Sequence, residues 1–247
     1  MTDSNRPSTL QMFPWEAMIA AVKRSVDFPG FDAFYADLFE SLPQNSPETR
    51  RRVANLIARA YFPNRSLEDL PTRVWCAYRR DDLLAGIMRV MALEAEPVIA
   101  RFVLEQVLVL ESGAVFDAAR ARDFVGTTFG RSDPKSYQRL LTTTHHLGFL
   151  ARSGQQWSVS AIARPADTFL ILLHARFAPT PRIVRMSDIL SAPFWRYLGM
   201  RSPAEVRAVL HEADAARLIA RYVTVDELEQ VTTCYSFDEY LSERIAL

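Results

Sequence analysis

The spacing of apolar residues predicts a series of helices in the first 110 residues. Between Trp15 and Val26 the apolar positions recur at steps of three and four, the period of a helix with one buried face. A second short helix of the same kind is expected to end before Pro43. Further segments with helical character follow Ser46 and span 72–78, 81–94 and 97–110. Together they predict a bundle of helices with short connections.

One helix has a clear beginning, because Ser46 fits an N-cap and Pro47 fits the first helical position. We expect its apolar face to point into the core, with the residues Val53, Leu56, Ile57 and Ala60. The opposite face carries the basic residues Arg50, Arg51, Arg52 and Arg59. These arginines form either a second phosphate-binding face or a solvated helix face balanced by nearby acidic residues, and both interpretations stay open.

The pattern changes near residue 113. We expect a helix over 116–129, a polar turn, and a second helix over 134–147. Gly148 is then followed by a strand over 149–151, a polar tip over 152–156 and a return strand over 157–159. A helix, a turn, a helix and a β-hairpin follow one another in this order in a winged helix-turn-helix, which we therefore predict for residues 113–164.

The second helix of this segment has the two faces that a DNA-reading helix needs. Its apolar stripe is expected to consist of Tyr137, Leu140, Leu141, Thr144 and Leu147. The residues outside the stripe are of types that bond phosphates and base edges, and we expect DNA contacts from Lys135, Ser136, Gln138, Arg139, Thr142 and Thr143. Further contacts are expected from the preceding turn and from the hairpin tip, through Arg131, Arg152, Gln155 and Gln156. The helix N-terminus, with Ser132 or Asp133 as its cap, is expected to point its amide groups toward a phosphate.

The last third of the chain mixes helices with strands. Helices are expected over 166–177, over 203–214 and from Phe237, and strands over 218–223 and 231–235. The predicted fold class is therefore mainly α with a small β component. The predicted domains are a flexible arm over 1–14, a helical bundle over 15–112, a winged helix over 113–164 and a C-terminal α+β module over 165–247.

Charge and composition limit the partners. The 29 basic and 29 acidic residues cancel, so any nucleic-acid site must be local. No apolar stretch reaches the roughly 20 residues of a membrane-spanning helix, and the first residues do not have the pattern of a signal peptide. We therefore expect a cytoplasmic protein with no membrane partner.

Cys76 and Cys234 are far apart in the sequence and are expected to be reduced and packed.

The sequence gives little sign of catalysis. The sequence has four histidines, His145, His146, His174 and His211. The adjacent pair, His145 and His146, cannot face one ligand from a helix, and no cysteine or acidic partner sits at ligand spacing from it. A glycine-rich phosphate loop and a G-x-S-x-G motif are both absent from the sequence. We expect no metal, no cofactor and no enzymatic activity.

The run from Ser46 to Arg59, Ser-Pro-Glu-Thr-Arg-Arg-Arg-Val-Ala-Asn-Leu-Ile-Ala-Arg, precedes a helical stretch and a predicted winged helix that ends in Leu147-Gly-Phe-Leu. This order of parts resembles the BrxA proteins of bacteriophage exclusion (BREX) systems, over residues 15–160. The resemblance implies a small DNA-binding accessory protein of a bacterial anti-phage system, with other defence-system subunits as further partners. It does not extend to the C-terminal part, from Phe194 onward.

The function that we expect from the sequence is non-catalytic binding of double-stranded DNA in phage defence. Two alternatives stay open. One is a transcriptional regulator. The other is a protein-interaction adaptor, in which the winged helix and the apolar C-terminal hairpin dock partner subunits without DNA.

Overall fold

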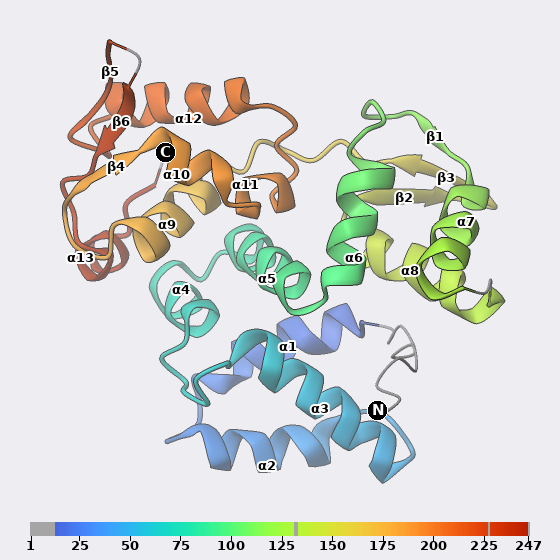
Figure 1. The fold of residues 1–247 in the computed structure, drawn as a ribbon. Helices are drawn as coiled ribbons and strands as arrows, with labels where there is room; N and C mark the ends of the chain where they lie inside the picture. Colours follow the sequence, from blue (N-terminus) through green and yellow to red (C-terminus); the bar gives the residue numbers. More distant parts are fainter. Residues whose placement is uncertain (1–12, 131–132, 227, 247) are drawn as a thin grey trace, which may run out of the picture. The chain divides into compact units, whose positions relative to one another are not determined.

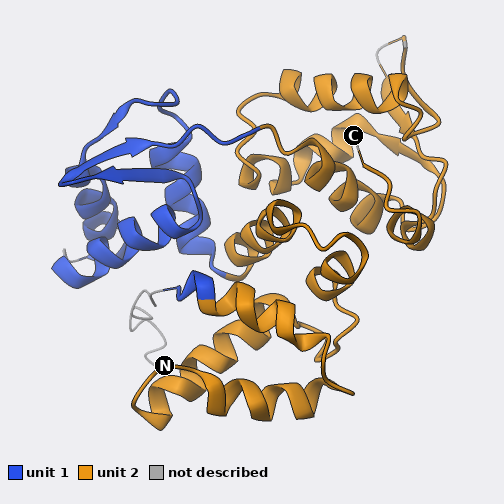
Figure 2. Cartoon of the chain, turned by 180° about the vertical axis from the view of Figure 1, so that it is seen from behind, with its two compact units in different colours: residues 1–16, 96–163 blue, residues 17–95, 164–247 orange. Residues whose placement is uncertain are grey.

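The computed structural model describes residues 13–130, 133–226 and 228–246 (Figure 1). The described chain is mainly helical with two small three-stranded antiparallel sheets, so the predicted fold class is confirmed at this level. Contacts group the chain into two compact units, each built from two stretches of sequence (Figure 2). Unit 1 comprises residues 1–16 and 96–163, and unit 2 comprises residues 17–95 and 164–247. The four-part division of the sequence stays a prediction.

The first stretch of unit 2 is helical, as predicted. Its helices are α1 (Trp15–Ser25, which begins in unit 1), α2 (Phe31–Ser41), α3 (Pro47–Tyr61), α4 (Leu70–Tyr78) and α5 (Asp81–Ala95). Ser46 caps α3, because its hydroxyl accepts a hydrogen bond from the amide of Thr49 at 3.5 Å. The four residues predicted to face the core from α3, from Val53 to Ala60, are buried. Local capping and periodicity therefore predicted this helix correctly.

The second stretch of unit 2 contains α9 (Ala166–Phe177), β4 (Ile183–Arg185), α10 (Met186–Ser191), α11 (Phe194–Tyr197), α12 (Pro203–Ala215), β5 (Arg221–Val225), β6 (Leu228–Thr232) and α13 (Phe237–Ser242). The strands form a sheet of order β4-β6-β5, and β4, α10 and α11 were not predicted. The strand predicted to begin at Leu218 begins three residues later. Leu218 instead closes the end of α12, where its amide donates to the carbonyl of Ala213 at 2.8 Å.

Unit 1 contains α6 (Pro97–Phe102), the π-helix η1 (Val103–Val107), β1 (Val115–Phe116), α7 (Ala118–Phe129), α8 (Pro134–His146), β2 (Leu150–Ser153) and β3 (Gln156–Val159). The prediction of one α-helix over 97–110 was wrong in its second half. There the amide of Leu108 bonds the carbonyl of Val103, five residues back, at 2.9 Å, which widens the helical turn. The sheet has the order β1-β3-β2, and β1 was not predicted.

The two cysteines lie on the surface. Cys76 and Cys234 are free, but both are exposed, so the prediction that they are packed was wrong. Each follows apolar or β-branched neighbours in sequence without sharing their burial.

Membrane spans were also sought among the helices. Within the described part of the chain, no helix combines the length and the apolar character that crossing a membrane requires.

Candidate functional site

The helix α7 of unit 1 packs on an aromatic core. The ring of Phe102 in α6 lies 5.9 Å from the ring of Phe116 in β1 and 5.2 Å from that of Phe124 in α7. Asp117 caps α7 by accepting a hydrogen bond from the amide of Ala119 at 2.8 Å, which is why this helix begins two residues later than predicted. Gly130 ends α7 with a φ of 69°, the left-handed conformation that glycine adopts without strain.

The orientation of α8 is close to the prediction. Leu140, Leu141, Thr144 and Leu147 are buried, and Tyr137 is half-buried. On the other face Lys135 and Gln138 are exposed, and the residues Ser136, Arg139 and Thr142 are half-buried. This arrangement places a strip of polar and charged side chains on the surface of α8.

Thr143 does not belong to that surface. Its side chain is 1% exposed, and its hydroxyl is buried without a hydrogen-bond partner among the described residues. The prediction that Thr143 lies outside the buried stripe, where it would contact DNA, was therefore wrong. Thr143 follows Leu140 by three residues, and that spacing places both side chains on the buried side of the helix.

The N-terminus of α8 is occupied by its own cap. The carboxylate of Asp133 accepts hydrogen bonds from the amide of Lys135 at 3.4 Å and from the amide of Ser136 at 3.0 Å. It also accepts a hydrogen bond from the hydroxyl of Ser136 at 2.7 Å. The predicted cap at Asp133 is confirmed. Its carboxylate satisfies these two amide groups and adds negative charge there, so the prediction that they are unpaired was wrong, and the contact with a phosphate stays a prediction.

Both histidines at the end of α8 contact backbone carbonyls. The Nδ1 atom of His145 lies 2.7 Å from the carbonyl oxygen of Leu150, and its ring packs edge-on against Trp157 at 5.9 Å. The Nδ1 atom of His146 lies 3.1 Å from the carbonyl oxygen of Phe13. These contacts hold α8 against the hairpin and against the segment before α1, so His146 has a structural partner.

The hairpin of β2 and β3 carries the other predicted contacts. Ser153 pairs with Gln156, so the turn consists of Gly154 and Gln155 and is shorter than the predicted tip of five residues. Gly154 has a φ of 60°, a conformation that favours glycine. Arg152 is exposed, donates from Nε to the carbonyl of Gly154 at 2.9 Å and lies 5.2 Å from the centre of the Trp157 ring. Gln155 and Gln156 are also exposed. Arg131 and Ser132 lie outside the described residues.

The predicted basic face of α3 belongs to unit 2. Arg51 and Arg52 are exposed, and neither forms an ion pair with a carboxylate that the structure describes. Arg50 is different, because its guanidinium lies 3.5 Å from the carboxylate of Glu40 and 5.3 Å from the centre of the Phe39 ring. Arg59 is exposed and lines a groove beside α3. The arginines exposed on this face are therefore Arg51, Arg52 and Arg59.

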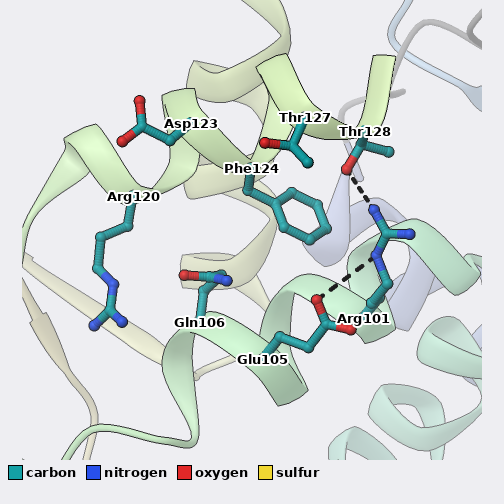
Figure 3. Close-up of a pocket in the computed structure, with 8 residues that line it drawn as sticks. All are labelled: Arg101, Glu105, Gln106, Arg120, Asp123, Phe124, Thr127 and Thr128. Atoms are coloured by element: carbon teal, nitrogen blue, oxygen red, sulfur yellow. Dashed lines mark hydrogen bonds and ion pairs between the residues drawn. The ribbon is translucent and has the colours of Figure 1, made fainter. Parts of the chain in front are cut away.

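A groove of about 590 Å³ in unit 1, between α6–η1 and α7, was not predicted from the sequence (Figure 3). Figure 3 shows Arg101 at one end of it and Arg120 at the other. Arg101 forms an ion pair with Glu105 at 3.8 Å and a hydrogen bond with Thr128, whereas no described carboxylate pairs with Arg120. The lining carries two arginines and two carboxylates, and its charges balance. One wall of this groove is the π-helix, which periodicity does not reveal, so the sequence carries no signal for it.

Among the residues that the structure describes, no group of three or more histidine, cysteine or acidic side chains is arranged to hold a metal ion. Three comparisons with known proteins found no matching family model, no matching curated protein and no matching solved structure.

Proposed function

We propose that this chain is a non-catalytic protein that binds double-stranded DNA through unit 1. The order β1, α7, α8, β2, β3, with a sheet of order β1-β3-β2, is typical of a winged helix. In that fold the second helix enters the major groove and the hairpin contacts the backbone. The observation that carries the proposal is the polar strip of α8, where Lys135 and Gln138 are exposed, whereas Leu140, Leu141, Thr144 and Leu147 on the opposite face are buried.

The contacts divide into two kinds by their chemistry. Lys135 and Arg152 present cationic groups suited to phosphates, which position the protein without reading sequence. Arg139 and Gln138 lie on the middle of the strip, and their side chains suit guanine and adenine edges in the major groove. Arg51 and Arg52 of α3 extend the proposal to a second phosphate-binding face in unit 2.

The proposal is tested by fluorescence anisotropy of a labelled random duplex at several salt concentrations. A variant with Lys135→Ala, Arg139→Ala and Arg152→Ala should weaken binding and reduce the steepness of the salt dependence by about one unit for each lost phosphate contact. A matched control removes three exposed arginines far along the chain, Arg182→Ala, Arg185→Ala and Arg217→Ala. The control should bind as the wild type does. No binding at low salt, or equal losses in both variants, would refute the proposal.

The biological setting that we propose is phage defence, as a BREX-like accessory protein acting in the cytoplasm on double-stranded DNA. The support for it is the resemblance of residues 15–160 to BrxA proteins. A transcriptional regulator would use the same interface and differs in having one preferred duplex sequence. Selection of bound duplexes from a random pool separates the two, because a regulator enriches a single motif.

A second candidate function is an adaptor that docks other defence-system subunits without DNA. The specific observation that favours it is on the sheet of unit 2, where Ile183 is 56% exposed and Leu228 is 63% exposed. Large exposed apolar side chains are common at protein contacts. An adaptor would bind its partners equally well at high and low salt and would show no salt-dependent affinity for a duplex.

A further inference from the structure

A second groove, in unit 2, has a lining that differs in chemistry from the groove of Figure 3. It has a volume of about 320 Å³ and lies between α2, α3 and the residues that follow α3. Its lining consists of Phe31, Tyr35, Asn55, Ala58, Arg59, Phe62, Pro63 and Arg65. These described lining residues include two guanidinium groups and an amide but no carboxylate. A groove with such a lining favours a ligand that is rich in hydrogen-bond acceptors and negatively charged.

The floor of this groove is aromatic. The rings of Phe31 and Tyr35 are stacked with centroids 5.8 Å apart, and Phe62 lies 6.0 Å from Phe31. Phe31 and Phe62 are buried, whereas Tyr35 is half-buried. A flat ring can therefore pack against the exposed part of Tyr35 without displacing a core side chain. Stacking of a base on an aromatic ring stabilises a complex by about 1 to 3 kcal/mol.

Asn55 is oriented by Tyr35. The hydroxyl of Tyr35 donates to Oδ1 of Asn55 at 2.5 Å, which fixes the carboxamide by its acceptor side. The Nδ2 group of Asn55 makes no hydrogen bond with a described residue, so it is left to donate. A planar ring with carbonyl oxygens at its edge, such as thymine or uracil, matches this donor.

Arg65 can change its partner at little cost. Its guanidinium lies 5.1 Å from the centre of the Phe31 ring and 3.0 Å from the carboxylate of Asp32. The Arg65 and Asp32 side chains are 71% and 91% exposed, and ion pairs as exposed as this contribute little. A phosphate at the rim of the groove can therefore compete for Arg65.

The groove continues along the surface of α3 as a basic stripe. Arg51, Asn55 and Arg59 follow one another at four-residue steps, and Arg52 precedes Asn55 by three, so these side chains share one side of the helix. From Arg51 to Arg59 the stripe rises about 12 Å, which is enough for more than one phosphate. A free mononucleotide would leave Arg51 and Arg52 unused, whereas a strand would use the whole stripe.

We propose that the stripe of α3 and the aromatic groove beside it bind a single-stranded nucleic acid, with one unstacked base in the groove and its phosphates on the arginines. This site belongs to unit 2 and assigns a single strand to the second phosphate-binding face of α3, whereas α8 and the hairpin, which carry the duplex proposal, belong to unit 1. A positively charged track combined with an aromatic platform is the usual arrangement for binding single strands without strong sequence preference.

The test uses the full chain and a fluorescein-labelled oligothymidylate of about ten nucleotides, within the usual site size for such platforms, followed by anisotropy at several salt concentrations. Asn55→Asp keeps the acceptor for Tyr35 but replaces the free donor with a negative charge, and it should weaken binding at least about tenfold. Removing both arginines, by Arg51→Ala with Arg52→Ala, should reduce the salt slope by about 1.4, or about 0.7 for each lost contact with a single strand. Thermal unfolding of each variant checks that it folds.

The matched control is Arg182→Ala with Arg185→Ala, which removes two exposed arginines from the same unit and should leave binding unchanged. The proposal is overturned if Asn55→Asp binds as the wild type does, if the control loses as much as the α3 variant, or if thymidine monophosphate binds as tightly as the oligonucleotide. Lys135→Ala with Arg139→Ala separates the two sites. If these changes in unit 1 alone abolish oligothymidylate binding, the single strand binds there and not on α3.

Discussion

The carboxylate of Asp133 accepts two hydrogen bonds from Ser136, one from its amide at 3.0 Å and one from its hydroxyl at 2.7 Å. This cap fixes the first turn of α8, the turn that carries Lys135 toward the proposed DNA. It also places a negative charge at the helix end that lies near the phosphates in the proposed complex. The carboxylate of Asp133 therefore stabilises the helix but lowers its affinity for a polyanion.

Two substitutions of Asp133 separate its effect on helix stability from its effect on DNA affinity. Asp133→Asn keeps an acceptor for the amide groups of α8 but removes the charge, so the affinity for a duplex should rise severalfold at low salt. Asp133→Ala removes the cap as well and should lower the free energy of unfolding by about 1 kcal/mol. Anisotropy and urea denaturation of both variants check these expectations. If Asp133→Asn instead lowers the affinity for a duplex, the phosphates do not lie near the N-terminus of α8.

The neighbours Thr142 and Thr143 offer a matched pair of variants. Thr143→Val removes a buried hydroxyl that has no partner among the described residues, so it should leave duplex affinity unchanged and stabilise the fold by about 1 kcal/mol. Thr142→Val makes the same chemical change on the half-exposed side and should weaken duplex binding. If both variants weaken duplex binding equally, the proposed orientation of α8, with Thr142 toward DNA and Thr143 in the core, is contradicted.

His174 makes the stability of unit 2 depend on pH. Its ring is buried and stacked on Tyr240 with centroids 4.2 Å apart, and burial lowers the pKa of His174 below its ordinary value of 6.5. The unfolded chain then binds a proton that the folded chain does not, so stability is fully present above pH 6.5 and is lost as the pH falls toward the folded pKa. The loss approaches about 1.4 kcal/mol per pH unit.

His174→Phe keeps the stacked ring and cannot titrate, so the difference in unfolding free energy between it and the wild type should change between about pH 7 and about pH 5. Denaturant unfolding at each pH measures this difference, and other titrating groups cancel in it. A constant difference across this range would show that His174 takes up its proton equally well in the folded and unfolded chains.

Local signals explain which parts of the fold were predictable. Ser46, Pro47 and the apolar spacing after them were sufficient for α3, because a cap and a period are properties of adjacent residues. The π-helix at Val103–Val107 could not be predicted in this way, since its wide turn depends on what the helix packs against. Short strands such as β4 have too few residues to show alternation.

The candidate sites, like the fold, were predictable only where the signal lies in adjacent residues. The exposed strip of α8 was predicted from its period, but Thr143 was assigned to the wrong face because the buried stripe is wider than the leucines alone indicate. The aromatic groove joins residues of α2 with residues of α3 and beyond. Helix pairing of this kind depends on tertiary contacts, so neither Tyr35 nor Asn55 was a candidate in the sequence.

The central claim, that α8 and the hairpin of unit 1 contact duplex DNA, is tested most directly by photo-crosslinking. Benzoylphenylalanine is placed singly at Gln138 on α8, at Gln155 in the hairpin turn, and at the exposed Ala208 on α12 as a control. We expect crosslinks to a labelled duplex from positions 138 and 155, and we expect added salt to suppress them. Position 208 should give no crosslink above background. Equal crosslinking from all three positions, or crosslinking from Ala208 alone, would contradict the claim.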